Sequence, residues 1–214
     1  MTESWRVAYL AALRGGDRRG ALAIVDAARA AGLDLATLYL DVFQPSLREI
    51  GRLWQDNEIS VAEEHLATAI TQIAMARLYD GFCSSAPPNG RTLLAACAAS
   101  ERHEVGLRMV CDLLELEGWD ARYLGAAVPE DSLVGMVLSH QPDALALSAS
   151  TAPQLPLLRA MIRAVRVACG AATPFIIVGG RPFLEDETLA QRLGADAMGR
   201  DATEAARRVR ERFA

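Results

Sequence analysis

The chain of 214 residues carries 22 basic and 27 acidic side chains, and its formal net charge of −5 argues against binding nucleic acid by neutralising phosphates. No apolar run approaches the roughly 18 residues of a membrane span, and the acidic segment Met1–Val7 lacks the apolar stretch of a signal peptide. We therefore expect a soluble, cytoplasmic, helix-rich protein that binds neither nucleic acid nor a membrane.

The first eighty residues predict helices alone. Apolar residues recur at three- and four-residue intervals, and glycines end the first two patterns. Pro45 falls inside the third pattern and is expected to kink or interrupt that helix. Helices joined by short loops predict an antiparallel four-helix bundle over residues 1–83. The four helices are predicted at Trp5–Leu13, Asp17–Gly32, Asp34–Trp54 and Ser60–Cys83.

Residues 84–91 separate this bundle from a second pattern. Their Ser, Pro, Asn and Gly content is typical of a linker, so we place a domain boundary there. In residues 92–214, five short strands alternate with five helices, which predicts an α/β domain with a doubly wound five-stranded parallel sheet. The strands are predicted at Thr92–Ala99, Ala121–Leu124, Ala144–Ser148, Pro174–Val178 and Asp196–Met198, and the helices at Val105–Glu117, Pro129–His140, Pro156–Cys169, Glu185–Leu193 and Asp201–Phe213.

The turn Ala98–Gly106 lies between the first predicted strand and its helix. In an open parallel sheet, such turns form the ligand crevice at the carboxyl ends of the strands. His103 offers a nitrogen ligand there, and Gly106 lets a bulky group approach the backbone. Glu101 can fix the tautomer of His103, as carboxylates do behind metal-bound imidazoles. The alternative is an ordinary helix start whose polar residues only cap backbone N–H groups.

Two further strand ends point to the same crevice. The third strand leads into the hydroxyl residues Ser148, Ser150 and Thr151, and the fourth ends at Gly179 and Gly180, where absent side chains leave room for a large flat group or a long tail. Taken singly, hydroxyl residues and glycines are more often ordinary turn chemistry. Together, at successive strand ends, they describe a crevice with one imidazole ligand at its mouth.

The pattern Glu-x-His-x-x-Gly at 101–106, with Ser148 and the glycine pair, resembles the B12-binding fold. The resemblance implies that His103 replaces the dimethylbenzimidazole of cobalamin as the lower cobalt ligand, and that the displaced nucleotide tail enters the sheet. Glu101 stands where the motif usually has Asp, although the longer side chain still permits the hydrogen bond. The other cofactor-binding residues implied on this side are Arg102, Glu104, Gly106, Ser148, Ser150, Thr151, Gly179 and Gly180.

The bundle carries a second motif, in which Trp54 is followed after nine residues by Glu64 and His65. Trp54 ends one predicted helix and the pair begins its partner, so an aromatic face and two polar groups suit an adenosyl group at this hairpin. A buried tryptophan beside a surface Glu-His pair is the alternative. The motif resembles the signature of CarH-type adenosylcobalamin photoreceptors, and it implies a cap over the upper corrin face with Val61 also in the site. Gln55 replaces the histidine that binds cobalt there after photolysis.

Three functions compete. The resemblance implies a stand-alone cobalamin photoreceptor, not an enzyme and without a DNA-binding domain, that signals through homo-oligomers or a protein regulator. The second is a corrinoid methyl carrier that serves a methyltransferase and shares the size, the cap and the lower histidine. The third is a flavodoxin-like binding protein without cobalamin. Some relatives are thought to bind a bilin as well, but no cysteine here lies in a defensible attachment motif.

Overall fold

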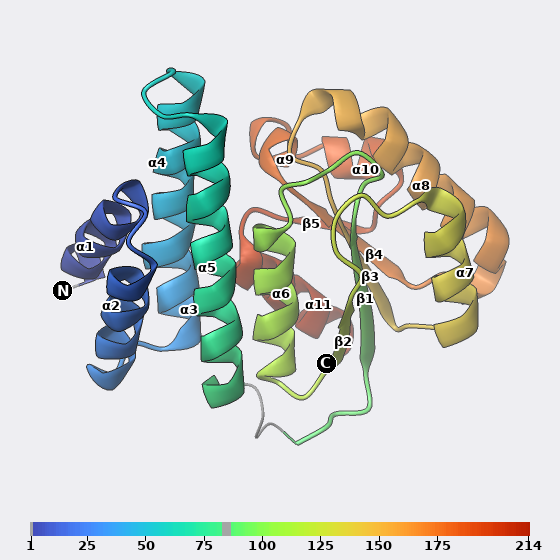
Figure 1. Cartoon of the computed structure of the whole chain (residues 1–214). Coiled ribbons are helices and arrows are strands. Elements are labelled where there is room, and N and C mark those ends of the chain that lie inside the picture. The colour runs from blue at the N-terminus through green and yellow to red at the C-terminus, as the bar shows by residue number, and fades with distance from the viewer. Residues whose placement is uncertain (1, 83–86) are drawn as a thin grey trace. The chain divides into compact units, whose positions relative to one another are not determined.

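Two units make up the chain, Met1–Ser84 and Ser85–Ala214 (Figure 1). The computed structural model describes residues 2–82 and 87–214. Cys83, the predicted end of the fourth helix, and the linker residues 84–86 lie outside the described residues. Within the described ranges, no helix combines the length and the apolar composition needed to cross a membrane.

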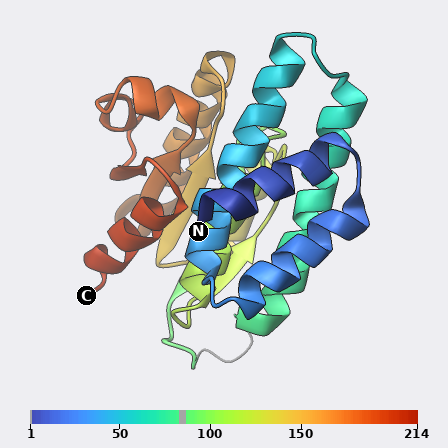
Figure 2. The same ribbon diagram turned by 90° about the vertical axis from the view of Figure 1, so that its left-hand side faces the viewer.

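The first unit is a bundle of helices, as predicted (Figure 2). Asp17 and Asp34 each cap the helix that follows by accepting a backbone hydrogen bond, at 2.9 and 2.7 Å. Ser60 and Glu63 form the expected capping box, with the Ser60 N–H donating to the Glu63 carboxylate. The elements are α1 (Thr2–Arg14), α2 (Arg18–Ala30), α3 (Leu35–Thr37), η1 (Leu38–Phe43), α4 (Gln44–Gln55) and α5 (Val61–Phe82).

Pro45 changes the type of the third helix but does not break it. The elements α3, η1 and α4 follow one another without a gap, and η1 is π-helical. In a π-helix each N–H bonds the carbonyl five residues back, and the Gln44 N–H accordingly donates to the Tyr39 carbonyl. Pro45 lies in the first turn of α4, where its missing N–H is tolerated. The predicted interruption is therefore a local widening of the helix.

An aromatic cluster forms the core of this bundle. The rings of Tyr9 and Phe43 stack with centroids 4.8 Å apart, and the Tyr39 ring lies 5.8 Å from that of Phe43. The Tyr9 hydroxyl donates to Oγ1 of Thr71 on α5 at 3.0 Å, so its polar end is satisfied in the buried interior. These contacts join α1 to both η1 and α5.

The second unit holds a five-stranded, all-parallel sheet, as the sequence predicts, and its strand order is β2-β1-β3-β4-β5. Its strands are β1 (Thr92–Cys97), β2 (Asp120–Tyr123), β3 (Ala144–Ser148), β4 (Phe175–Gly179) and β5 (Ala197–Gly199). Its helices are α6 (Val105–Glu115), α7 (Glu130–His140), η2 (Ala152–Gln154), α8 (Leu155–Cys169), η3 (Gly170–Ala172), α9 (Arg181–Glu185), α10 (Leu189–Leu193) and α11 (Ala202–Arg212).

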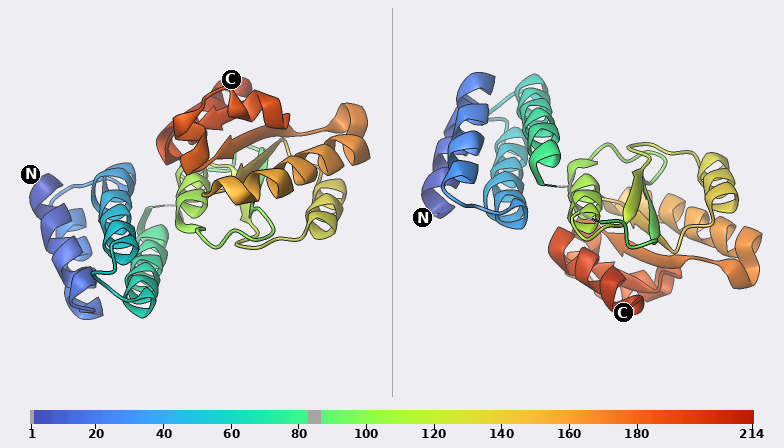
Figure 3. Two further views of the ribbon diagram at one scale, coloured as in Figure 1. Left: turned by 90° about the horizontal axis from the view of Figure 1, so that it is seen from above. Right: turned by 90° about the horizontal axis from the view of Figure 1, so that it is seen from below.

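Helices cover both faces of this sheet (Figure 3). Helices α7 to α10 share one apolar core with the strand residues Leu94, Leu145, Leu147, Ile176 and Val178. Helices α6 and α11 pack against each other and cover the opposite face. Because β1 and β3 are buried on both faces, their sequences are apolar apart from Thr92 and Ser148 at their ends, as is typical of central parallel strands.

The predicted helix Glu185–Leu193 is wrong in extent. The structure has two short helices there, α9 and α10, and Asp186 lies between them. The Asp186 carboxylate accepts hydrogen bonds from both the N–H and the hydroxyl of Thr188, at 2.9 and 2.7 Å. This local turn competes with the helix ladder and ends it.

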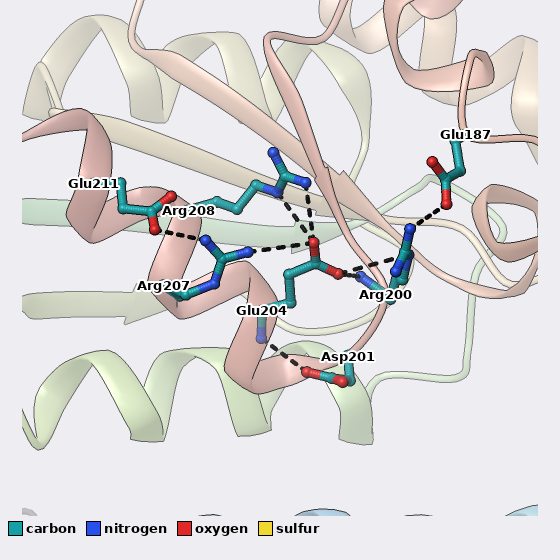
Figure 4. Close-up of polar contacts among 7 residues, drawn as sticks. All are labelled: Glu187, Arg200, Asp201, Glu204, Arg207, Arg208 and Glu211. Atoms are coloured by element: carbon teal, nitrogen blue, oxygen red, sulfur yellow. Dashed lines mark hydrogen bonds and ion pairs between the residues drawn. The ribbon is translucent and has the colours of Figure 1, made fainter.

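The loop after β5 is fastened to α11 by Glu204 (Figure 4). The Glu204 carboxylate accepts the Arg200 N–H at 3.1 Å and lies 3.0 Å from the guanidinium of Arg208 and 3.5 Å from that of Arg207. Asp201 caps the helix by accepting the Glu204 N–H at 2.8 Å. Acidic neighbours thus neutralise the arginines of this segment.

Candidate functional site

The carboxyl ends of β1, β3 and β4 lie side by side. Cys97, the last residue of β1, pairs in register with Ser148 of β3, and Ser148 pairs with Gly179 of β4. The loops that follow these strands therefore meet at one edge of the sheet, where open α/β sheets bind their ligands. This brings together the three strand-end groups that the sequence singled out.

Glu101 is fully buried in the loop after β1 and holds His103. Its Oε1 accepts the His103 backbone N–H at 2.7 Å and lies 2.7 Å from ring Nδ1. Its Oε2 accepts the backbone N–H of Ser150, in the loop after β3. The His103 side chain is 65% exposed. Because Nδ1 is engaged by the carboxylate, metal coordination by this ring falls to Nε2.

The buried Glu101 carboxyl is ionised. Burial raises its pKa, but hydrogen bonds from the His103 ring, the His103 N–H and the Ser150 N–H outweigh that effect and lower the pKa to about 2. The side chain therefore supplies the anionic partner that metal-binding histidines commonly have. Burial, followed by the charges of Glu101 and Glu104, raises the pKa of the neighbouring Cys97 thiol to about 12, so Cys97 packs as a neutral residue.

Glu104 fastens the same loop on its other side. The Tyr123 hydroxyl, at the end of β2, donates to Oε2 of Glu104 at 2.8 Å. Burial and then this hydrogen bond raise the pKa of Tyr123, which keeps its hydroxyl a donor. Arg102 is exposed between the two anchored glutamates. The loop that carries His103 is thus tied to β2 on one side and to β3 on the other.

The residues after β3 present backbone groups more than hydroxyls. Ser148 is buried, Ser150 is half-buried and Thr151 is exposed. The N–H groups of Ser150 and Thr151 both donate to Oε1 of Gln154, at 3.0 and 2.9 Å. Gln154 is only 8% exposed, and its Nε2 reaches the Ser100 carbonyl at 3.5 Å.

The three site glycines differ in what surrounds them. A Cβ on Gly180 would lie 2.0 Å from the Ala149 carbonyl oxygen, and its φ of +119° also favours glycine. The backbone of the fold therefore requires glycine at position 180, independently of any room that it leaves for a ligand. A Cβ on Gly179 would meet the nearest atom at 3.5 Å, which is ordinary contact. A Cβ on Gly106 would meet no neighbouring atom within 4 Å, so space is open beside it.

In the first unit, the motif residues lie around the α4–α5 hairpin. Trp54, in the last turn of α4, is 42% exposed, so the alternative of a buried tryptophan is wrong. Val61 begins α5 and is 50% exposed. Oε1 of Glu64 accepts the Thr68 hydroxyl at 3.2 Å. The side chain of His65 is 66% exposed, with Nε2 3.9 Å from the Glu64 carboxylate. Gln55, the last residue of α4, is exposed as well.

Arg52 braces that hairpin. Its guanidinium lies 2.8 Å from Oε1 of Glu49 one turn earlier and also pairs with Asp56 and Glu58 in the connecting loop. These contacts fix the chain immediately after Trp54. Trp54 is therefore exposed on a hairpin whose connecting loop is linked to α4 by the ion pairs of Arg52.

Two residues of the site, Gln154 and Tyr123, were not predicted from the sequence. Gln154 had a signal, because Thr151-x-x-Gln154 is a capping-box pattern ahead of a helix. Tyr123 had no such signal, since only the sheet order places the end of β2 beside the loop after β1. Among the described residues, no group of three or more His, Cys, Asp or Glu side chains could hold a metal ion.

Comparison with protein families decides what this arrangement is. Residues 5–79 match one B12 binding domain and residues 91–210 match a second. The chain belongs to the B12-binding domain family. The match accounts for the helical unit and for the parallel-sheet unit in the order in which the chain has them.

Two curated relatives of this B12-binding protein are repressors of Myxococcus xanthus. The chain is 35% identical to the HTH-type transcriptional repressor CarA over 144 residues, which are 66% of the chain and 46% of the relative. It is 28% identical to the HTH-type transcriptional repressor CarH over 191 residues, which are 89% of the chain and 62% of the relative. The chain thus spans between about half and two thirds of their lengths.

Solved structures share the fold at lower identity. The Methanosarcina barkeri monomethylamine corrinoid protein superposes with a TM-score of 0.86 at 18% identity, covering 99% of both chains. A cobalamin-binding protein from Desulfitobacterium hafniense has a TM-score of 0.54 at 22% identity and 97% coverage of both. The fold prediction is therefore confirmed: a helical cap followed by the Rossmann-like B12-binding domain.

The residues present fit cobalamin. An exposed imidazole whose Nδ1 is held by a buried, ionised carboxylate is the donor that an axial metal position requires.

Proposed function

We propose that the chain binds adenosylcobalamin with His103 as the lower cobalt ligand and acts as a light-dependent regulator. The observation that carries this proposal is the exposure of Trp54 and Val61 on the braced α4–α5 hairpin, beside Glu64 and His65. A bundle normally buries a tryptophan, and an aromatic face with adjacent polar groups is suited to an adenosyl group.

On the lower side, we assign separate roles to the loops at the sheet edge. Nε2 of His103 binds cobalt, and Glu101 orients the ring through Nδ1. The remaining residues line the crevice that receives the displaced nucleotide tail. These are Arg102, Glu104, Gly106, Ser148, Ser150, Thr151, Gly179 and Gly180.

On the upper side, residues 1–83 cover the corrin. When bound, the cofactor supplies a cobalt–carbon bond that light cleaves. Trp54 would pack against the adenosyl group, and this contact would keep the cap in place while that group is bound. The cap is then the two-state element, and its movement exposes or withdraws a surface for a second copy of the chain or for a protein regulator. An amide is a weaker cobalt ligand than an imidazole, so with Gln55 at this position a bis-histidine light state would require His65 to move to the upper side of the cobalt.

The test is reconstitution with adenosylcobalamin in the dark, followed by green light. We expect a His-coordinated absorption spectrum that His103→Ala abolishes and that His140→Ala, a matched change at the end of α7, leaves intact. Illumination should change both the spectrum and the elution volume on size exclusion. A spectrum that changes only as free cofactor does, with no change in elution, rules out the sensor.

A corrinoid methyl carrier is the second candidate, and Gln55 favours it, because a carrier needs no upper histidine. Trp54→Leu separates the two functions. For a sensor, the variant should bind adenosylcobalamin more weakly than methylcobalamin, since the lost contact is to the adenosyl group. For a carrier, affinity for the two forms should fall equally or not at all. Trp5→Leu, on α1, is the matched control.

A further inference from the structure

Two loops at the carboxyl edge of the sheet are joined by the side chain of Gln154. Its Oε1 accepts the backbone N–H groups of Ser150 and Thr151, at 3.0 and 2.9 Å, and its Nε2 reaches the Ser100 carbonyl at 3.5 Å. Ser100 belongs to the loop after β1, whereas Gln154 and its other partners follow β3. At 8% exposure, the side chain is shielded from competing water.

The Ser150 N–H is shared between two acceptors. It donates to Oε1 of Gln154 and to Oε2 of Glu101, whose other oxygen holds His103. The position of that one N–H therefore depends on Gln154, and the orientation of the Glu101 carboxylate depends on that N–H. A continuous chain of hydrogen bonds runs from Gln154 through Ser150 and Glu101 to the imidazole.

We propose that Gln154 is a positioning residue for the His103 imidazole, acting through the Ser150 N–H and the Glu101 carboxylate. The inference rests on the proposed role of His103 as lower cobalt ligand. Gln154 is also the N3 residue of a capping box whose N-cap is Thr151. A cap alone would need only the Thr151 N–H, however, and would not need the contacts to Ser150 and to the Ser100 carbonyl in the other loop.

A positioning role for Gln154 predicts a specific effect on cobalt coordination by His103. Outer partners of a metal-bound histidine commonly change metal affinity by about 10–100-fold when removed, because the ring loses its fixed orientation. Removing the Gln154 acceptor leaves Glu101 in place but lets the loop after β3 move away from it. The effect should therefore fall on His103 coordination itself, and not only on the stability of α8.

The test compares Gln154→Met, which removes the acceptor at similar length, with Gln191→Met on the exposed surface of α10. Affinity for cob(II)alamin is measured by titration. The histidine-coordinated fraction at saturation is measured by the nitrogen splitting in the electron paramagnetic resonance spectrum of protein labelled with 15N-histidine, because the 15N splitting separates a histidine ligand from the dimethylbenzimidazole nitrogen of the cofactor. We expect Gln154→Met to lose about 10-fold or more in affinity and to show a reduced coordinated fraction, while Gln191→Met matches wild type.

A purely structural Gln154 predicts a different result. Gln154→Met would then unfold at lower urea concentration yet bind with wild-type affinity and full histidine coordination, which overturns the inference. If Gln154→Met does not fold, Gln154→Glu carries the test together with Gln154→Asn, which keeps a polar amide but is one methylene shorter, so its acceptor is withdrawn from the Ser150 N–H. Gln154→Glu keeps that acceptor and should keep the coordinated fraction, whereas in Gln154→Asn the fraction should fall. An unchanged fraction in Gln154→Asn also overturns the inference.

A separate result would show that His103 is not the lower cobalt ligand. If His103→Ala binds cob(II)alamin with the same nitrogen splitting as wild type, then His103 is not the ligand and both proposals fail. If His103→Ala loses the splitting while Gln154→Met and Gln154→Asn keep it in full, then the lower-ligand assignment stands and only the positioning role of Gln154 is wrong.

Discussion

Replacing Glu101 by glutamine removes a buried negative charge while keeping the length of the side chain. The carboxylate accepts three hydrogen bonds, two from His103 and one from the Ser150 N–H. A glutamine amide offers one acceptor oxygen in place of two. In Glu101→Gln, at least one donor that now meets an ionised oxygen therefore faces an NH2 group.

Two independent estimates give the loss in the free energy of unfolding that we expect for Glu101→Gln. A hydrogen bond to a charged group contributes about 1.5–3 kcal/mol, and leaving a buried donor unsatisfied costs about 1–3 kcal/mol. The lowering of the Glu101 pKa from 4.5 to about 2 corresponds to about 3 kcal/mol, at roughly 1.4 kcal/mol per pKa unit. We expect Glu101→Gln to lower the free energy of unfolding of the second unit by about 2–4 kcal/mol.

The assay is urea unfolding of the cofactor-free protein at neutral pH. Trp119 is the tryptophan of the second unit, so its fluorescence reports that unit when Trp5 and Trp54 are replaced by phenylalanine. Glu185→Gln is the matched control, because this side chain on α9 is 73% exposed. If Glu101→Gln unfolds within about 0.5 kcal/mol of the control, the range typical of neutral surface changes, then the carboxylate does not hold the two loops and the reasoning is refuted.

Three further predictions test other parts of the fold by urea unfolding. Gly180→Ala should cost more than about 2 kcal/mol, because its methyl group would overlap a backbone oxygen, whereas Gly106→Ala should be neutral or stabilising in the cofactor-free protein, since it adds a better helix former in open space. Burial raises the pKa of Glu204, but hydrogen bonds from the Arg200 N–H and the Arg208 side chain outweigh it and lower the pKa. Its contribution is therefore fully present above the unfolded-state pKa of about 4.3 and is lost as the pH falls through the lowered folded-state pKa, so Glu204→Gln should cost about 1 kcal/mol at neutral pH and progressively less in acid. Tyr9→Phe should cost about 1 kcal/mol through the lost hydrogen bond to Thr71, and a neutral result would mean that this buried hydroxyl is not needed.

The strand ends were predictable because parallel topology leaves little freedom. Once strands alternate with helices, a parallel sheet places every carboxyl end at one edge, so Glu101, Ser148 and Gly179 were expected at that edge, and the observed order β1-β3-β4 makes them neighbours. Competition between side-chain hydrogen bonds and the backbone hydrogen bonds of a helix was harder to predict. The turn at Asp186 divides a segment whose periodicity is helical throughout, because side-chain hydrogen bonds to the backbone carry no apolar period.

The links between the strand-end loops were not predictable for a related reason. Gln154 and Tyr123 act across strands that are far apart in sequence, and a single sequence does not reveal which side chains meet there. Pro45 illustrates the opposite case. Its sequence signal was clear, but whether the helix would break or widen depended on packing around Tyr39 and Phe43, which the sequence pattern does not specify.

The departures from the usual motifs carry different information. The Glu101 carboxylate holds His103 and also accepts the Ser150 N–H, which donates to Gln154 as well. Both a sensor and a methyl carrier need that lower assembly, and it does not discriminate between them. The discriminating residues lie on the first unit. Trp54 is exposed on a hairpin braced by Arg52, with Gln55 beside it, so we expect variants of these residues to separate the two proposed functions.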